Sequence, residues 1–241
     1  MNKIEELKKM INESKRIVVF SGAGLSTNSG IPDFRSASGI YNEKLKSKYT
    51  PEEIISHSFF LKHPKEFYEF YFSKMVYPEA KPNIAHEYFA SLQKDHQVTI
   101  VTQNIDDLHQ MAGSKNVIEL HGSIVRNYCT KCRKYFNIKD ILHFSPGIPY
   151  CECGGIIKPD VVLYEESLNE DDIVNAVRQI GDCDMLIVVG TSLVVYPAAG
   201  FVRYYNGNKL VLLNKSETQY DLKANLVIHD DIKNVIEELM K

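Results

Sequence analysis

The sequence has no long apolar segment, no internal repeat and almost no excess of charge of either sign. No apolar run approaches the roughly 18 residues that a membrane-spanning helix needs, and the formal net charge is −3 over 241 residues. So small a charge gives no electrostatic basis for binding a nucleic-acid backbone or an anionic membrane. We therefore expect neither as a partner. The length allows one large domain, or one domain with a small insert.

The N-terminal segment lacks the features of a signal peptide. Residues 1–16 alternate charged side chains with apolar ones at helical spacing, which predicts a surface helix. We therefore expect a cytoplasmic protein. Of the five cysteines four cluster, whereas Cys183 stands alone in an apolar segment, where a small buried hydrophobic residue is the simplest interpretation.

A glycine-containing turn near the N-terminus predicts a phosphate-binding loop. Residues 16–35 read RIVVFSGAGLSTNSGIPDFR, in which an apolar run stops at a turn that contains Gly22 and Gly24. Residues 25–27 then open a predicted helix. The two glycines permit a tight turn and close approach to a ligand, and the N–H groups of the helix start offer a site for a pyrophosphate.

This turn departs from the dinucleotide-binding fingerprint G-x-G-x-x-G. Thr27 stands where a third glycine is expected, and although Glu43 lies about 20 residues further on, no predicted strand precedes it. The segment continues instead into residues 31–35, a loop that presents an acid, an aromatic ring and a guanidinium. On its own, the turn does not distinguish a cofactor loop from an ordinary strand-to-helix connection.

Polar residues follow two further predicted strands. Residues 98–101 precede Gln103, Asn104 and Asp106, and residues 117–120 precede His121. In an open α/β sheet, polar groups past the carboxyl ends of strands lie in the ligand crevice, although Asn and Asp are also common helix caps. A histidine with an ordinary pKa near 6.5 is suited to act as a general base. A hydrogen-bonded structural histidine is the alternative.

Four cysteines form two close pairs, C-x-x-C and C-x-C. Cys129 and Cys132 make the first pair, and Cys151 and Cys153 the second. Two such pairs in a cytoplasmic chain predict one tetrahedral zinc ion, and four thiolates leave no open position, so the site is expected to be structural. Disulfides are disfavoured in that compartment.

The remaining segments complete an α/β pattern. Residues 41–92 lack strands and predict helices, with Thr50 as N-cap, Pro51 at the first helical position and Glu53 in a capping box. Strands are expected at 185–189, 209–213 and 226–228, and a helix at 232–240. Residues 156–166 predict an extended edge with an exposed proline, to which a peptide could pair.

Together these pieces resemble the sirtuin family of NAD-dependent protein-lysine deacylases, in its bacterial form. The resemblance is carried, in order, by GAGLSTNSGIPDFR, TQNIDDLH, ELHG, the four-cysteine module, KPDVVLYEE, GTSL and LLN. It implies an α/β fold, in which a Rossmann-like parallel sheet with helices on both faces is joined by a small zinc-ribbon and helical lobe. Residues 1–35, 83–125 and 160–241 would form the large domain, and 36–82 and 126–159 the small lobe.

The resemblance also implies roles for individual residues. His121 would be the general base, with Asn104 beside it in catalysis. Val162, through its carbonyl, and Tyr164 would contact the substrate peptide, and zinc would be held by Cys129, Cys132, Cys151 and Cys153. The NAD-binding residues would be Ala23, Gly24, Thr27, Phe34, Arg35, Gln103, Ile105, Asp106, Thr191, Ser192, Asn214, Asp231 and Ile232.

The implied reaction is deacylation of acyl-lysine proteins by a monomer. The acyl-lysine amide oxygen attacks C1′ of the nicotinamide ribose, nicotinamide leaves, and His121 accepts a proton from a ribose hydroxyl on the path to O-acyl-ADP-ribose. A mono-ADP-ribosyltransferase and a zinc-ribbon interaction module with a vestigial nucleotide fold are the alternatives.

Two departures from the family bear on the substrate. The family's usual Phe-Gly-Glu is replaced by residues 164–166, Tyr-Glu-Glu. By the same resemblance, Tyr68 and Tyr71 match the Tyr-x-x-Arg of sirtuins that favour acidic acyl groups, without the arginine that would pair with a succinyl carboxylate. We therefore predict removal of acetyl or longer apolar acyl groups over succinyl groups.

Overall fold

The centre of the protein is a six-stranded parallel sheet. The computed structural model describes residues 2–34, 39–40 and 48–241. The strands of this sheet lie in the order β3-β2-β1-β7-β8-β9. Their bounds are β1 Arg16–Ser21, β2 Gln97–Thr102, β3 Val117–Glu119, β7 Met185–Val189, β8 Leu210–Leu213 and β9 Leu226–Ile228.

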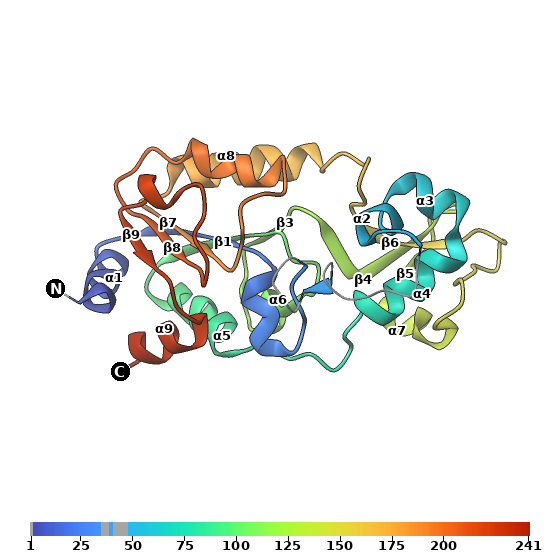
Figure 1. The fold of residues 1–241 in the computed structure, drawn as a ribbon, viewed down its shortest axis with the longest axis horizontal. Helices are drawn as coiled ribbons and strands as arrows, with labels where there is room; N and C mark the ends of the chain where they lie inside the picture. Colours follow the sequence, from blue (N-terminus) through green and yellow to red (C-terminus); the bar gives the residue numbers. More distant parts are fainter. Residues whose placement is uncertain (1, 35–38, 41–47) are drawn as a thin grey trace.

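Helices cover both faces of this sheet (Figure 1). Helices α1 (Lys3–Asn12), α5 (Ile84–Ser91) and α9 (Ile232–Leu239) pack on one face. Helix α8 (Glu170–Asp182) and the 3-10 helix η5 (Ala198–Tyr204) pack on the other. A strand buried on both faces needs an unbroken apolar run, which is what residues 17–20 and 185–189 supply. The predicted fold class is confirmed.

The order of the strands fixes where a ligand can bind. The chain runs outward from β1 to β2 and β3 on one side, and from β7 to β8 and β9 on the other. The direction of winding therefore reverses between β1 and β7, and such a reversal opens a crevice at the carboxyl ends of the strands. The segments that follow β1, β2 and β7 meet there.

A second, antiparallel sheet lies to the right of the first in Figure 1. Its order is β5-β4-β6, with β4 at Gly122–Cys129, β5 at Tyr135–Asn137 and β6 at Ile157–Val161. An apolar cluster joins this sheet to the helices α2 (Pro51–Ile54), α3 (His57–Lys62) and α4 (Pro64–Lys74). Helix α7 (Ile138–Ile141) packs against β4 and β5. Strands β4 and β6 run across the expected domain boundaries at 125/126 and 159/160, and that division stays a prediction.

Local expectations are met in part. Thr50 and Glu53 form the predicted capping box, and Cys183 is buried in the core. Residues 25–27 belong to a 3-10 helix, η1 (Ala23–Ser29), and not to an α-helix. The prediction of an exposed proline at the edge segment is wrong, because Pro159 is buried within β6. Proline is nevertheless compatible with that position, since β6 is an edge strand.

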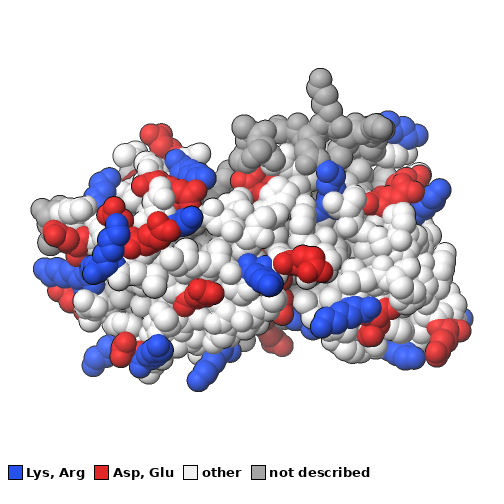
Figure 2. Space-filling model, turned by 90° about the horizontal axis from the view of Figure 1, so that it is seen from below, with Lys and Arg blue, Asp and Glu red and all other residues white. Residues whose placement is uncertain are grey.

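The face of the protein seen in Figure 2 carries charges of both signs. On the face shown in Figure 2, lysines and arginines are interspersed with aspartates and glutamates. No helix in the described ranges 2–34, 39–40 and 48–241 is both long enough and apolar enough to cross a membrane.

Candidate active site

A cavity of about 740 Å³ opens at the carboxyl ends of the parallel strands and extends to the segment after β6. The expected catalytic, NAD-binding and peptide-binding residues that the structure describes all line this cavity, whereas the four cysteines, Tyr68 and Tyr71 do not; Arg35 lies outside the described residues. The lining includes Ala23, Gly24, Thr27, Phe34, Gln103, Asn104, Ile105, Asp106, His121, Val162, Tyr164, Thr191, Ser192, Asn214, Asp231 and Ile232. The structure thus brings these residues together, while their individual roles remain predictions.

The two glycines after β1 allow close packing against the turn after β7. The Gly24 N–H donates to the Gly190 carbonyl oxygen at 2.8 Å, and a Cβ on Gly24 would lie 2.9 Å from that oxygen. Gly190 has φ +60, and a Cβ there would collide with the Leu25 backbone. Glycine is required on both sides of this contact, which keeps the backbone of the loop at the floor of the cavity.

Three polar side chains form a chain of hydrogen bonds beneath this loop. The Asn104 amide donates to the Gly22 carbonyl and to Ser26 Oγ, both at 3.1 Å, and Ser26 Oγ donates to Asp106 Oδ2 at 2.6 Å. Both amide hydrogens of Asn104 are therefore used, and its side-chain oxygen is the atom left to bind a ligand. Burial raises the pKa of Asp106, while bonds from Ser26 and the Leu108 N–H lower it. Ser26 was not singled out from the sequence.

His121 is held in one tautomer by the backbone. Its Nδ1 lies 2.9 Å from the carbonyl oxygen of Gln103, which can only accept a hydrogen bond, so Nδ1 carries the proton. Nε2 is then the unprotonated atom. Burial lowers the pKa of His121, and the bond to Gln103 partly opposes this. Gly122 follows with φ +74, and a Cβ there would collide with the Asp160 carbonyl, so only glycine fits beside the histidine.

Gln103 contributes an unpaired donor to the cavity wall. Its Oε1 accepts from Thr191 Oγ1 at 2.8 Å, whereas its buried Nε2 has no partner among the described residues. A buried amide without a partner is costly unless a ligand or water completes it. A nucleotide ribose or amide offers acceptors of the required kind, so the residues present fit a nucleotide cofactor.

The opposite wall is shaped by reciprocal bonds between Thr191 and Asn214. Asn214 Oδ1 accepts from the Thr191 N–H at 3.0 Å, and Asn214 Nδ2 donates to the Thr191 carbonyl at 2.7 Å. Next to them, Asp231 caps α9 and contacts Lys215 at 2.8 Å. Burial opposes ionisation of Asp231, but bonds from Lys215, Asn28 and the Lys233 N–H lower its pKa to about 2. With this carboxylate engaged, the backbone at Asp231 is the group left for a ligand.

The segment after β6 has a carbonyl available for a peptide. The Val162 N–H donates to the His121 carbonyl at 3.0 Å, and no donor from the described residues reaches the Val162 carbonyl oxygen. Tyr164 lies beside it with 38% of its surface exposed. Tyr196, across the cavity, is 63% exposed. This arrangement can receive an extended peptide between the two exposed rings.

The expected counterparts of Tyr-x-x-Arg do not reach the cavity. Tyr68 and Tyr71 are fully buried in the cluster around α4, and the Tyr68 hydroxyl donates to the Ile157 carbonyl at 2.6 Å. Lys74, at the end of the same helix, lines the cavity instead.

The four cysteines of the two pairs converge. Their Sγ atoms all lie within 4.8 Å of one another, with Cys129–Cys153 at 3.4 Å and Cys132–Cys151 at 3.7 Å. Sulfurs at about 2.3 Å around a tetrahedral zinc ion would be about 3.8 Å apart, which is close to these separations. The Lys131 and Cys132 N–H groups donate to Cys129 Sγ, both at 3.4 Å. The donor set fits zinc, and the cluster suggests a structural zinc site.

Two buried histidines lie behind the cavity. His86 and His109 are 0% and 1% exposed, with ring centroids 4.9 Å apart. His109 Nε2 contacts Ser21 Oγ at 2.9 Å, and Ser21 Oγ donates to Thr102 Oγ1, which also accepts from the Asn104 N–H. Burial lowers the pKa of His86 to about 4 and, together with the charge of His86, lowers that of His109 to about 3. Both are neutral in the folded protein at pH 7.

This burial predicts acid sensitivity. Between pH 6.5 and the lowered pKa values the unfolded chain binds more protons than the folded one, so stability is lost as the pH falls through this range. The shift of His86 alone, from 6.5 to about 4, corresponds to about 3 kcal/mol. We expect the free energy of unfolding in urea to fall by at least this much between pH 6.5 and 4.

The contribution of His86 to this pH dependence can be tested with two variants. His86→Gln should flatten the pH dependence of the free energy of unfolding, whereas His143→Gln, at an exposed position, should leave it unchanged. Equal slopes for the wild type and the His86 variant would show that the buried ring does not bind the extra proton on unfolding.

The fold and the cavity define a class: an α/β protein whose nucleotide crevice adjoins a peptide-sized edge and a four-cysteine metal module. The sequence model of the Sir2 family matches residues 22–197. NAD-dependent protein deacetylases of Clostridium perfringens and Clostridium tetani are 57% and 56% identical to this chain, each covering 98% of it and 97% and 96% of their own lengths. The chain therefore belongs to the Sir2 family, as its motifs predicted.

Solved structures of Sir2 proteins have the same fold as this chain. A Sir2 protein with a deacetylated p53 peptide and 3′-O-acetyl ADP-ribose superposes with a TM-score of 0.89 at 39% identity, over 98% of this chain and 97% of that one. A Sir2 complex with a p53 peptide and NAD+ gives a TM-score of 0.86 at 38% identity, with the same coverage.

Proposed function

We propose that this protein is an NAD-dependent protein-lysine deacetylase that releases nicotinamide and transfers the acyl group to ADP-ribose. The observation that carries the proposal is His121, whose Nδ1 proton is fixed on the Gln103 carbonyl so that a neutral Nε2 is available within the cavity. The names of the similar deacetylases support the same activity.

When bound, NAD supplies an electrophilic sugar carbon, C1′ of its nicotinamide ribose. His121 Nε2 accepts the proton of a ribose hydroxyl. The Asn104 side-chain oxygen and the Gln103 amide hold the ribose, while Ile105 and Asp106 hold the carboxamide. Phe34 covers the site and excludes water, which would otherwise compete for the electrophile. Thr191, Ser192, Asn214 and the backbone of Asp231 and Ile232 bind the adenosine part.

The substrate is an acyl-lysine protein, which pairs in extended form with the segment after β6 through the Val162 carbonyl. We further propose that the protein acts in the cytoplasm as a monomer, with one structural zinc ion and without a nucleic-acid partner. The small net charge of −3 supports the last point.

The test is product analysis. NAD and an acetyl-lysine peptide are incubated with the enzyme, and the products are identified and quantified by mass spectrometry. Deacetylated peptide, nicotinamide and O-acetyl-ADP-ribose in equal amounts are expected. ADP-ribosylated protein without deacetylation would identify a mono-ADP-ribosyltransferase, and no consumption of NAD would leave an interaction module as the function.

The proposed function also predicts which acyl group the enzyme removes faster. The cavity is lined by apolar residues such as Ile55, Met75 and Leu163, and its cations among the described residues are two lysines, Lys215 and, at the end of α4, Lys74. An ammonium lacks the planar fork that grips a carboxylate with two bonds. We therefore expect kcat/KM for an acetyl-lysine peptide to exceed that for the succinyl peptide by about tenfold or more, which is one lost charge-assisted pair.

Lys74→Arg is the matched variant for this preference. It should raise kcat/KM for the succinyl peptide and leave the acetyl value nearly unchanged, as read from initial rates on the two peptides. Comparable turnover of both peptides by the wild type would contradict the prediction.

A further inference from the structure

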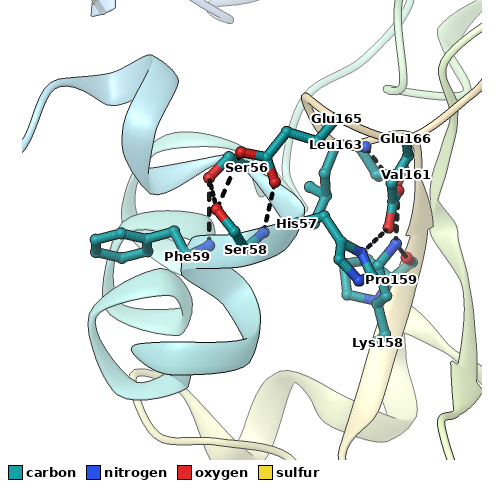
Figure 3. A network of polar contacts seen from close by, with 10 residues as sticks. All are labelled: Ser56, His57, Ser58, Phe59, Lys158, Pro159, Val161, Leu163, Glu165 and Glu166. Atoms are coloured by element: carbon teal, nitrogen blue, oxygen red, sulfur yellow. Dashed lines mark hydrogen bonds and ion pairs between the residues drawn. The ribbon is translucent and has the colours of Figure 1, made fainter.

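The segment that would receive the peptide contains a glutamate in a conformation that favours glycine. Glu165 has φ 75, in the left-handed region that a Cβ disfavours. The fold retains this conformation because the side chain makes compensating bonds. Glu165 Oε2 accepts from the Ser58 N–H at 2.8 Å and Oε1 from Ser58 Oγ at 3.0 Å (Figure 3).

Its neighbour Glu166 points toward β6. Glu166 Oε1 contacts His57 Nδ1 at 2.8 Å, and Oε2 accepts from Lys158 Nζ at 3.2 Å and from the Leu163 N–H at 2.8 Å (Figure 3). Burial opposes ionisation of Glu166, but these three donors together lower its pKa. The carboxylate is therefore charged and fully engaged inside the protein.

The backbone joins the same two segments. The Tyr164 N–H donates to the Ile55 carbonyl at 3.0 Å, the His57 N–H donates to the Tyr164 carbonyl at 2.9 Å, and Ser56 and Tyr164 form a parallel bridge. Residues 164–166 are thus bonded to residues 55–58 by backbone and side chains alike. We call these two segments together the clamp.

The clamp adjoins the proposed peptide edge. Val162, Leu163 and Tyr164 precede Glu165 directly and line the cavity. The orientation of their backbone groups depends on how the next residue is held, because a change of φ at Glu165 would turn the preceding peptide units. The Glu165 carboxylate bonds to α3, and the Glu166 carboxylate bonds to α3 and β6 (Figure 3), so both are engaged inside the protein.

We propose that Glu165 is a positioning residue for the peptide substrate: by accepting from the N–H and hydroxyl of Ser58 in the first turn of α3, it fixes residues 162–164 in the extended form to which an acyl-lysine peptide pairs. This proposal rests on the deacetylase function proposed above. It assigns the Tyr-Glu-Glu segment a role in peptide affinity, separate from NAD binding and from the chemistry at His121.

The test uses three substitutions at one position. Glu165→Asn keeps a residue that tolerates the left-handed region but is too short to reach Ser58. Glu165→Gly removes both the side chain and the backbone strain. Glu165→Gln keeps an oxygen that can accept from the Ser58 N–H. We expect the first two to raise the peptide KM by about fivefold to tenfold with kcat and the KM for NAD unchanged, and the third to remain near wild type.

A variant of Ser58 tests whether Glu165 acts on peptide binding through its bonds to this residue. Ser58→Ala removes one of the two bonds and should raise the peptide KM by less than Glu165→Asn does. In the double variant the two increases should not multiply, because the shared contact is already lost. Thermal unfolding of each variant, measured alongside, shows that the effect is not a general loss of folding.

Direct binding separates this proposal from the proposed function. The affinity of a fluorescent acetyl-lysine peptide is measured for the wild type, Glu165→Asn and Glu165→Gly without turnover. Weaker binding by both variants supports the positioning role, even if the wild type turns over no peptide and the deacetylase function fails. Equal affinities, a loss confined to kcat, or no peptide binding by the wild type would each overturn it.

Discussion

Replacing His121 by alanine is expected to lower the rate of deacetylation by about 1,000-fold, within the range usual for loss of a general base. The imidazole bonds to the protein through Nδ1 and the Gln103 carbonyl, so its removal costs one backbone contact and should leave the fold intact. The measurement is kcat for deacetylated peptide by mass spectrometry, with the thermal unfolding midpoint recorded for both proteins. A decrease of less than tenfold would exclude His121 as the base.

The pH profile supplies an independent check on the same residue. Burial lowers the pKa of His121 below its ordinary value of 6.5, with the Gln103 bond opposing part of the shift. The neutral, proton-accepting form therefore persists to lower pH than for a free imidazole. Activity should be retained at pH 6.5 and fall only as the pH drops through the lowered pKa. An acid limb centred above 6.5 would mean that another group titrates.

The parts of the site that the sequence predicts are those placed by sheet geometry. Gly24, Asn104 and His121 each follow an apolar run that forms a strand of the parallel sheet, and the carboxyl ends of such strands meet at one edge. Their convergence on one cavity follows from three local patterns and one general rule. The four-cysteine site is also predictable from a local pattern, because the short spacing within each pair keeps its two sulfurs close together.

Other features depend on contacts between distant segments and leave no local pattern. Ser26 joins Asn104 to Asp106 across the cavity floor, yet in the sequence it is an ordinary polar residue of a loop. The position of α4 in the fold places Lys74, and not Tyr71, at the cavity. Glu165 reads as a surface charge until its bonds to Ser58 are seen. Such pairings are fixed by tertiary packing, which the linear spacing of residues does not determine.

Removing the zinc ion is expected to unfold the antiparallel sheet and abolish deacetylation, although no cysteine lines the cavity. Around the metal module the buried members of the apolar cluster, among the described residues, are Cys129, Ile141, Cys151 and Ile157. The cavity ends of β4 and β6 also pack against α2–α4, whereas the metal end of the sheet has little apolar core to hold it without the ion. Structural zinc contributes about 10–16 kcal/mol of apparent binding energy in small zinc domains. That is far more than the loss of one ordinary side-chain contact.

The cysteine variants test this directly. Cys132→Ser should lower bound zinc from about one per chain, set by the four-thiolate site, to nearly none, as measured by elemental analysis. Cys183→Ala removes the one cysteine outside the cluster and should keep its zinc. Because β4 begins one residue after His121 and β6 ends one residue before Val162, disorder in this sheet would displace both the proposed base and the peptide edge. A Cys132→Ser enzyme that lacks zinc yet keeps wild-type peptide turnover would show that the metal does not support the site.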